Sequence, residues 1–272
     1  MMAKFDMGAA WDDSMNLLRS HSALTGTIAA VFLFLPALAL SWFGPVPIEP
    51  PTGATMDQIL ATFRESARQA LPYQLLITLV GAIGGIGILR LWLSRAGVSV
   101  GEALVFAIRM VPTVIAVQII MGLAFALAAL ILLLPGLAAA GGALGALLIF
   151  VGLVLFLVFA AFVWARLAVV SPVIADRTLY NPIEALQQSW TLTRGNARRI
   201  FLFLFLVMLV IVVASLLLGG IAALIGGAGE GAGRLISGLV EGGVAAVGGL
   251  VSLAIAAATY RQLAVGGTDI FS

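Results

Sequence analysis

Long uninterrupted runs of apolar residues dominate the chain and alternate with short polar segments. A helix needs about 20 apolar residues to cross the roughly 30 Å of hydrocarbon in a bilayer. Six runs reach that length, at residues 23–43, 71–93, 110–134, 143–164, 200–225 and 235–258. The pattern therefore predicts an all-α polytopic membrane protein, a bundle of six transmembrane helices in a single domain.

The first run has an alternative interpretation as a signal peptide. Ala37-Leu38-Ala39 has the small-x-small spacing of a signal-peptide cleavage site. However, the apolar run continues beyond this point to Trp42, and the segment before it has a helical pattern. These two features favour an uncleaved membrane span.

A short amphipathic helix is predicted at residues 182–194, between the fourth and fifth runs. Asn181 is a good N-cap, Pro182 suits the first helical position, and Glu184 is placed to reach back to the backbone amide of the cap. Gly195 is placed to end the helix in a left-handed conformation.

One face of this helix is mostly apolar, because Ile183, Leu186, Trp190 and Thr193 recur at helical spacing. Such a helix can lie in the membrane interface, or it can pack on the inner ends of the spans. Both interpretations stay open at this stage.

The segment 44–70 is the one sizeable polar stretch predicted on the outer side. Its first part is rich in proline, and Thr55 and Gln58 then form a capping-box pair. An apolar stripe follows at helical spacing, which predicts a short amphipathic helix at the outer surface that leads into the second span. A solvated helical lead-in is the alternative.

The polar segments contain a weak internal repeat. Residues 9–19 align with 184–194, and a weaker copy at 101–107 shares Glu-Ala-Leu with 184–186. The alignment predicts three units of short helix plus transmembrane hairpin, at 6–93, 98–167 and 180–258. Chance similarity between amphipathic segments is the alternative. All three units have the same orientation, unlike the inverted repeats of many transporters. The identical residues of the first two copies include Ala10 with Ala185, Ser14 with Ser189, and Arg19 with Arg194.

Composition supports the membrane assignment and narrows the chemistry. Only 10% of the residues are charged, against about 25% in soluble domains, and the mean hydropathy is +1.17. The net charge of +2 gives no indication of nucleic-acid binding. With no cysteine and one histidine, His21, the chain cannot build a disulfide, a thiolate nucleophile or a multi-imidazole metal site.

The basic residues predict the orientation. Cytoplasmic loops carry an excess of Lys and Arg, and a cytoplasmic N-terminus places eleven of the fourteen basic residues inside. The outer three are Arg64, Arg68 and Arg234. Both termini are therefore predicted to be cytoplasmic.

Several arginines near the inner span ends are candidates for binding anionic lipid headgroups, each contributing about 1 kcal/mol near a charged leaflet. The alternative is that they only signal orientation. The six candidates are Arg90, Arg109, Arg166, Arg194, Arg198 and Arg199.

Three polar residues inside the apolar runs are further candidates. Glu241 in the sixth run could bind a cation or relay a proton, or it could reach the outer surface or pair with Arg234. Gln74 and Gln118 indicate hydrogen bonds between helices rather than a substrate site. His21 is interpreted as a helix-end residue at the interface.

Other sequence features carry no chemistry of their own. Three pairs of glycines at four-residue spacing, beginning at Gly81, Gly141 and Gly238, indicate close helix packing, within one chain or in a homo-oligomer. No nucleophile–base pair or paired carboxylates stand out. The sequence therefore predicts a protein that is not an enzyme, with no cofactor and no metal.

The stretch around the predicted helix resembles a known family. Arg166 at a span end is followed by Ser171-Pro172, by Pro182 with Glu184-Ala185-Leu186, and by Ser189-Trp190, Leu192-Thr193 and Arg194-Gly195. This pattern resembles the bacterial six-span membrane domain found alongside glycerophosphoryl diester phosphodiesterases, and related uncharacterised membrane proteins. The resemblance implies a location in the bacterial inner membrane and a role in membrane or lipid physiology. The family's catalytic domain has no counterpart here, so phosphodiesterase activity is not implied.

The leading functional hypothesis is a non-enzymatic membrane protein that binds anionic lipid headgroups, or a membrane-protein partner, at the cytoplasmic face, with a role in envelope or lipid homeostasis. The alternative is a small transporter or permease subunit for a lipid-like or amphiphilic substrate. Transport predicts a polar cavity near Gln74, Gln118 and Glu241. Headgroup binding predicts a groove beneath the helix 182–194.

Overall fold

The computed structural model describes residues 4–20, 22–45, 48–94, 97–139, 142–226 and 231–265. Within these residues the chain is helical and contains no strand, which confirms the all-α prediction. The helical segments are α1 (Met7–Ser20), α2 (Ser22–Ala29), η1 (Ala30–Phe34), α3 (Leu35–Phe43), α4 (Met56–Leu93), α5 (Val100–Ala138), α6 (Gly142–Arg166), α7 (Val170–Arg177), α8 (Pro182–Leu192), α9 (Ala197–Gly226) and α10 (Ala232–Val265).

Six helical stretches are long and apolar enough to cross a membrane, in the places that the sequence predicts. The chain is therefore a multi-pass integral membrane protein. The first stretch combines α2, η1 and α3, and η1 is a π-helical turn that no sequence pattern predicted. The second and third stretches, α4 and α5, have 38 and 39 residues and extend well beyond their apolar runs.

The polar segments before the second and third spans are continuous with those spans. The Thr55–Gln58 capping box is confirmed and begins α4 itself, so the predicted amphipathic helix runs without a break into the second span. Its position at the membrane surface stays a prediction, as does the alternative of a solvated lead-in. The weak repeat copy at 101–107 is likewise the start of α5, which a second capping box opens at Ser99 and Glu102. Both helices continue through a proline near the junction, Pro72 in α4 and Pro112 in α5.

The three aligned segments share a pattern of burial even though only α1 and α8 are separate helices. In each, two small residues four positions apart are at most 1% exposed and pack against neighbouring helices. Their origin by repetition stays a prediction. The three pairs are Ala10 and Ser14 in α1, Ala103 and Ala107 in α5, and Ala185 and Ser189 in α8.

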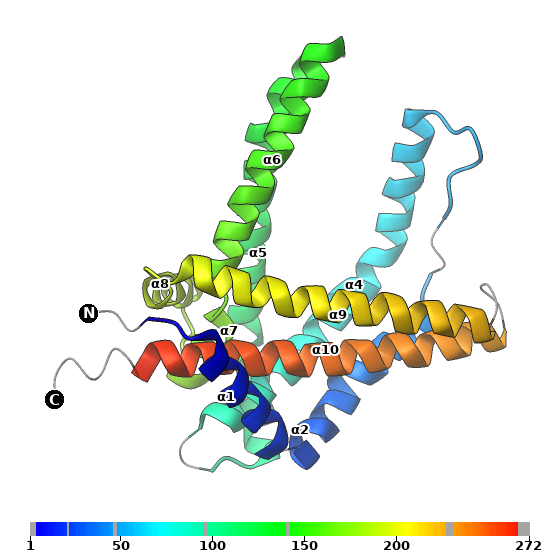
Figure 1. The fold of residues 1–272 in the computed structure, drawn as a ribbon. Coiled ribbons are helices and arrows are strands. Elements are labelled where there is room, and N and C mark those ends of the chain that lie inside the picture. Colours follow the sequence, from blue (N-terminus) through cyan, green and yellow to red (C-terminus); the bar gives the residue numbers. More distant parts are fainter. Residues whose placement is uncertain are drawn as a thin grey trace.

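One end of the molecule holds the best-packed part of the core (Figure 1). Here α1, α7 and α8 meet the adjoining ends of α4, α5, α6, α9 and α10. We call this region the basic end, because Arg90, Arg166 and Arg199 lie in it. The start of the chain and the end of α10 meet there, joined by an ion pair of 3.2 Å between Asp13 and Arg261. Fully buried side chains at this end include Phe5, Ile88, Leu89, Met110, Val173, Ile200 and Ile255.

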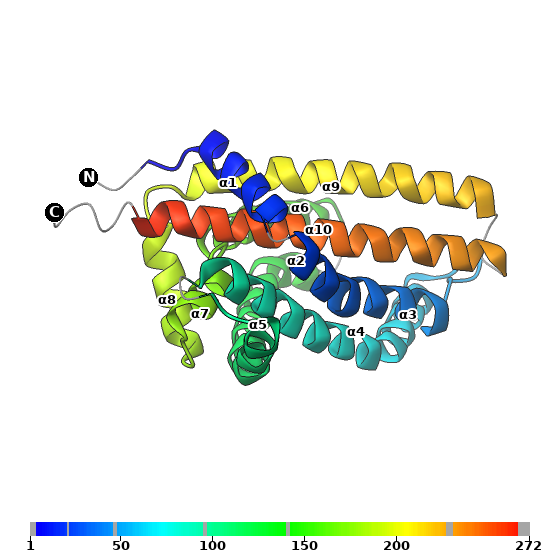
Figure 2. The ribbon, with the colours of Figure 1, turned by 90° about the horizontal axis from the view of Figure 1, so that it is seen from below.

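Away from the basic end the spans fan out. Helices α9 and α10 lie side by side, whereas the α5–α6 hairpin stands at a steep angle to them in both views (Figures 1 and 2). The six spans are therefore not all parallel to one another. Since lipid tails are as apolar as leucine, no hydrophobic force draws the outer parts of the spans together.

The first span is packed into the structure through α3 and α10. The indole nitrogen of Trp42 donates to the carbonyl oxygen of Leu235 at 3.3 Å, and Arg234 donates to the carbonyl oxygens of Ser41 and Gly44. A Cβ at Gly238 would clash with Trp42. The glycine pair that begins at Gly238 therefore serves packing within one chain. Gly141 lies outside the described residues.

Candidate functional site

Helix α8 closes the basic end by capping the last turn of α6. The hydroxyls of Ser189 and Thr193 both donate to the carbonyl oxygen of Arg166, at 3.0 and 2.9 Å. Both side chains are fully buried, as is Ala185. These contacts place α8 on the span ends. The face it buries is made of small residues, whereas Ile183 and Trp190 are 56% and 40% exposed. The face that α8 buries therefore overlaps only in part with the predicted apolar stripe.

The predicted helix signals at α8 are confirmed with one exception. The side chain of Asn181 accepts from the backbone amides of Ile183 and Glu184, and Gly195 has a φ of +82°. The carboxylate of Glu184 does not reach back to the cap, but accepts from the side-chain amide of Gln188 at 3.0 Å. Gln188 lies one helical turn further on in α8 and also accepts from Arg177. Because the carboxylate of Glu184 bonds to Gln188, it lies away from the N-cap.

Arg166, at the end of α6, is unusual among the charged residues of the described chain because it is buried. Its side chain is only 5% exposed, and its Nε atom is buried without a hydrogen-bond partner. The guanidinium carbon lies 4.5 Å from the ring centroid of Trp190 and 6.0 Å from that of Phe162. Within the described chain no carboxylate pairs with it. Aromatic faces attract the cation, but they leave its positive charge uncompensated.

Arg166 lines a pocket of about 510 Å³ that we call the arginine pocket. The pocket lies between the end of α6 and the start of α9, and its lining includes Phe162, Arg194, Arg198 and Phe201. No acidic side chain lines it. The lining combines cationic groups with aromatic and small apolar groups, which suits an amphiphile with an anionic head.

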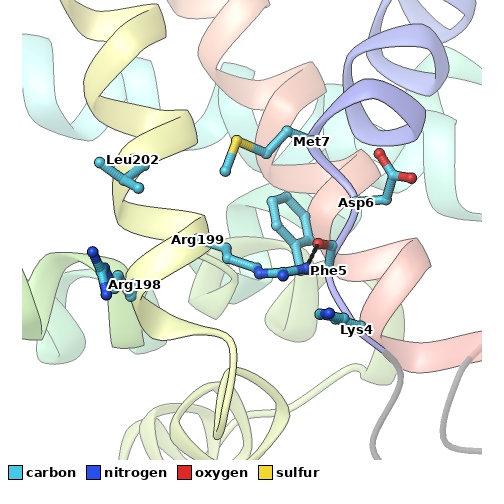
Figure 3. A pocket seen from close by; sticks show the side chains of 7 residues that line it. All are labelled: Lys4, Phe5, Asp6, Met7, Arg198, Arg199 and Leu202. Atoms are coloured by element: carbon cyan, nitrogen blue, oxygen red, sulfur yellow. Dashed lines mark hydrogen bonds between the residues drawn. The ribbon is translucent and has the colours of Figure 1, made fainter.

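A second pocket, of about 690 Å³, lies on the other side of Arg198, where the first residues of the chain cross α9 (Figure 3). We call residues 4–6 the strap. Phe5 is 1% exposed, and its backbone amide donates to Asn196 at 3.0 Å. Arg199 donates to the carbonyl oxygen of Phe5 at 3.2 Å. Arg199 therefore fixes the strap, whereas Arg198 points away from it (Figure 3). Sequence patterns gave no signal for this contact, because the partners are 191 or more residues apart.

The other two arginine candidates lie apart from the arginine pocket. Arg90 donates to the carbonyl oxygen of Ala175 on α7 at 2.9 Å, and its guanidinium lies 4.4 Å from the ring centroid of Phe106. Arg109 is exposed on α5. The six arginine candidates therefore do not gather at one site. Arg166, Arg194 and Arg198 line the arginine pocket. Arg199 follows Arg198 on α9.

The three intramembrane polar candidates do not share a cavity. Gln118 lines a pocket of about 420 Å³ between η1, α4, α5, α7 and α10, whose lining includes neither Gln74 nor Glu241. Glu241 is exposed, and Arg234 bonds to carbonyl oxygens of the first span rather than to Glu241. His21 lies outside the described residues. The arrangement does not build the cavity that the transport alternative requires.

No group of three or more His, Cys, Asp or Glu side chains is placed to hold a metal ion in the part of the chain that the structure describes. No protein-family model matches the chain, and no curated protein or solved structure matches it. The resemblance to the six-span membrane domain stays a prediction.

Proposed function

We propose that this integral membrane protein binds one anionic phospholipid in the arginine pocket, with the basic end facing the cytoplasm of a bacterial inner membrane. The single observation behind the proposal is Arg166, which is almost fully buried and unpaired beside a pocket lined by two more arginines. A buried charge is costly unless a counter-charge accompanies it. A phosphate in the pocket would supply that counter-charge.

The lining also suits the rest of a lipid. Phe162 of α6 and Phe201 of α9 add apolar surface to the lining of the pocket. Basic pockets between span ends are a common form of headgroup site. We propose a non-enzymatic role in envelope or lipid homeostasis, in which bound lipid occupies the groove beside α8.

Native mass spectrometry of the protein extracted with its surrounding lipids tests the proposal. The double variant Arg194→Gln/Arg198→Gln removes two exposed charges of the pocket and leaves buried Arg166 and the strap residue Arg199 in place. We expect retention of anionic lipid to fall by about 30-fold, since each contact contributes about 1 kcal/mol.

The matched control is Arg64→Gln/Arg68→Gln, which removes two exposed charges from α4 far from the pocket along the chain. It should retain anionic lipid as the unchanged protein does. Equal loss in both double variants would show general charge attraction rather than a site. The proposal would be overturned if neither the unchanged protein nor the control retained anionic lipid.

A further inference from the structure

The pocket lined by Gln118, which we call the neutral pocket, lies apart from the arginine pocket and shares no lining residue with it. Four polar side chains from four helices meet around it, and none of its lining side chains is charged. The polar residues are Thr78 of α4, Gln118 of α5, Ser171 of α7 and Ser252 of α10.

Three of these residues lie well inside the apolar part of their helices. Gln118 follows Arg109 by nine residues, Thr78 precedes Arg90 by twelve, and Ser252 precedes Arg261 by nine. At 1.5 Å per residue they lie roughly 13 to 18 Å along the helix from these arginines. Water is therefore scarce around them when the protein is in a membrane.

The protein itself offers these polar side chains few hydrogen-bond partners. In the described structure, the side chains of Thr78, Gln118 and Ser171 make no hydrogen bond, and Ser252 bonds only to the carbonyl oxygen of Gly248 in its own helix. An amide offers two donors and an acceptor, and leaving it unpaired in hydrocarbon costs free energy. A ligand with its own donors and acceptors would remove that cost.

The first span adds an independent feature. Leu33, from the π-helical turn η1, lines the neutral pocket. Such turns are rare and occur frequently at functional sites. On α4, a Cβ at Gly81 would meet no atom within 4 Å, so this wall of the pocket is open.

We propose that the neutral pocket binds an uncharged lipid with hydroxyl and ester groups, of the acylglycerol class. A phosphate would find no cation here, and losing its hydration would be costly. The hydroxyl and ester groups can donate to and accept from Gln118 and the neighbouring hydroxyls. Leu89, Val114 and Leu253 contact the first carbons of the acyl chains. The volume of about 420 Å³ holds the head of such a lipid and leaves the chains in the surrounding bilayer.

Photolabelling of the full-length protein in phosphatidylcholine vesicles tests the proposal. The probes are a photoreactive diacylglycerol and a photoreactive phosphatidylglycerol with the same acyl chains. We expect the diacylglycerol probe to label peptides of α4, α5 or α10 around the pocket. Gln118→Leu should lower that labelling about fivefold, as loss of one hydrogen bond of about 1 kcal/mol implies, and Gly81→Leu should lower it at least as much by filling the pocket.

Gly122→Leu on α5 is the matched control, because a Cβ there also meets nothing within 4 Å and Gly122 does not line the pocket. It should leave the labelling unchanged, as should Arg194→Gln/Arg198→Gln. Equal effects of Gly81→Leu and Gly122→Leu, equal labelling of the pocket by the phosphatidylglycerol probe, or no labelling of the pocket would each overturn the proposal. Loss of anionic lipid from the arginine pocket would leave this result unaffected, so the two sites are tested separately.

Discussion

The basic end and the outer part of the α5–α6 hairpin are both helical and apolar, yet they are stabilised in different ways. At the basic end, side chains from many helices bury one another, so that Met110 on α5 is fully buried. About five helical turns further along the same helix, the surface faces lipid instead, and Leu127 is 58% exposed. One helix therefore crosses from a protein core to a lipid-facing surface.

The hairpin is nevertheless closely packed along its inner seam. A Cβ at Gly136 would lie 2.6 Å from the backbone nitrogen of Ile149, and one at Gly152 would fall on the carbonyl oxygen of Leu132. Backbones this close gain dispersion contacts without large side chains. The basic end is therefore stabilised by large buried side chains, whereas the seam of the hairpin is stabilised by close backbone contact at glycines.

The largest expected effect comes from removing volume at the basic end. Met110→Ala should lower the free energy of unfolding by about 2–5 kcal/mol, because a cavity opens among buried side chains. Leu127→Ala, on the lipid-facing part of the same helix, should change it by less than about 0.5 kcal/mol. Thermal unfolding in detergent, followed by tryptophan fluorescence, measures both. Similar losses in the two variants would remove the distinction between the regions.

Adding volume to the hairpin is expected to have the next largest effect. Gly152→Val should destabilise the α5–α6 seam by about 1–3 kcal/mol through overpacking, whereas Gly122→Val has open space for its side chain. Hydrogen exchange measured by mass spectrometry should rise in peptides of the outer hairpin and stay unchanged at the basic end. A rise at the basic end of equal size would mean that the two regions unfold together.

A smaller effect is expected from one buried hydrogen bond at the basic end. Ser189→Ala removes the bond to the carbonyl oxygen of Arg166 and should cost about 1 kcal/mol. Ser215→Ala is the control, since its hydroxyl bonds only to Ile211 within α9. Thermal unfolding compares the two. An unchanged unfolding temperature for Ser189→Ala would contradict a contribution of this hydrogen bond to stability.

The smallest effect is expected at the surface. Asp13→Asn removes the ion pair with Arg261. The side chain of Arg261 is 47% exposed and that of Asp13 is 32% exposed. The change should lower stability by roughly 0.2–1 kcal/mol, and the loss should vanish in high salt. Asp12→Asn on the same helix removes the same charge without an ion pair. At about 1 M salt the screening length is about 3 Å. A loss of stability that persists there would contradict the contribution of an exposed ion pair.

The features predicted correctly from the sequence are those that depend on neighbouring residues. The apolar runs predicted six spans, and Asn181, Thr55 and Gly195 predicted local caps and turns. The steep angle of the hairpin was not predictable, because periodicity does not encode how helices diverge. A bias of arginines toward one side likewise does not say which of them meet.

The arginine candidates show this limit most clearly. Arg90 and Arg199 have the same sequence signature as Arg194 and Arg198, but their guanidinium groups bond to carbonyl oxygens of Ala175 and Phe5. Those partners are 85 and 194 residues away in the chain. The burial of an arginine at the end of α6 also depends on α8 folding back over it, which the apolar pattern of α8 indicates only as one of two alternatives.

The strap at residues 4–6 has a consequence for the order of assembly during synthesis. Phe5 leaves the ribosome before its partners Asn196, Arg199 and Phe203, which belong to α9 and the turn before it. Asp6 exchanges hydrogen bonds with Gln262 near the end of α10. The strap therefore reaches its final position only after α9 and α10 have been made.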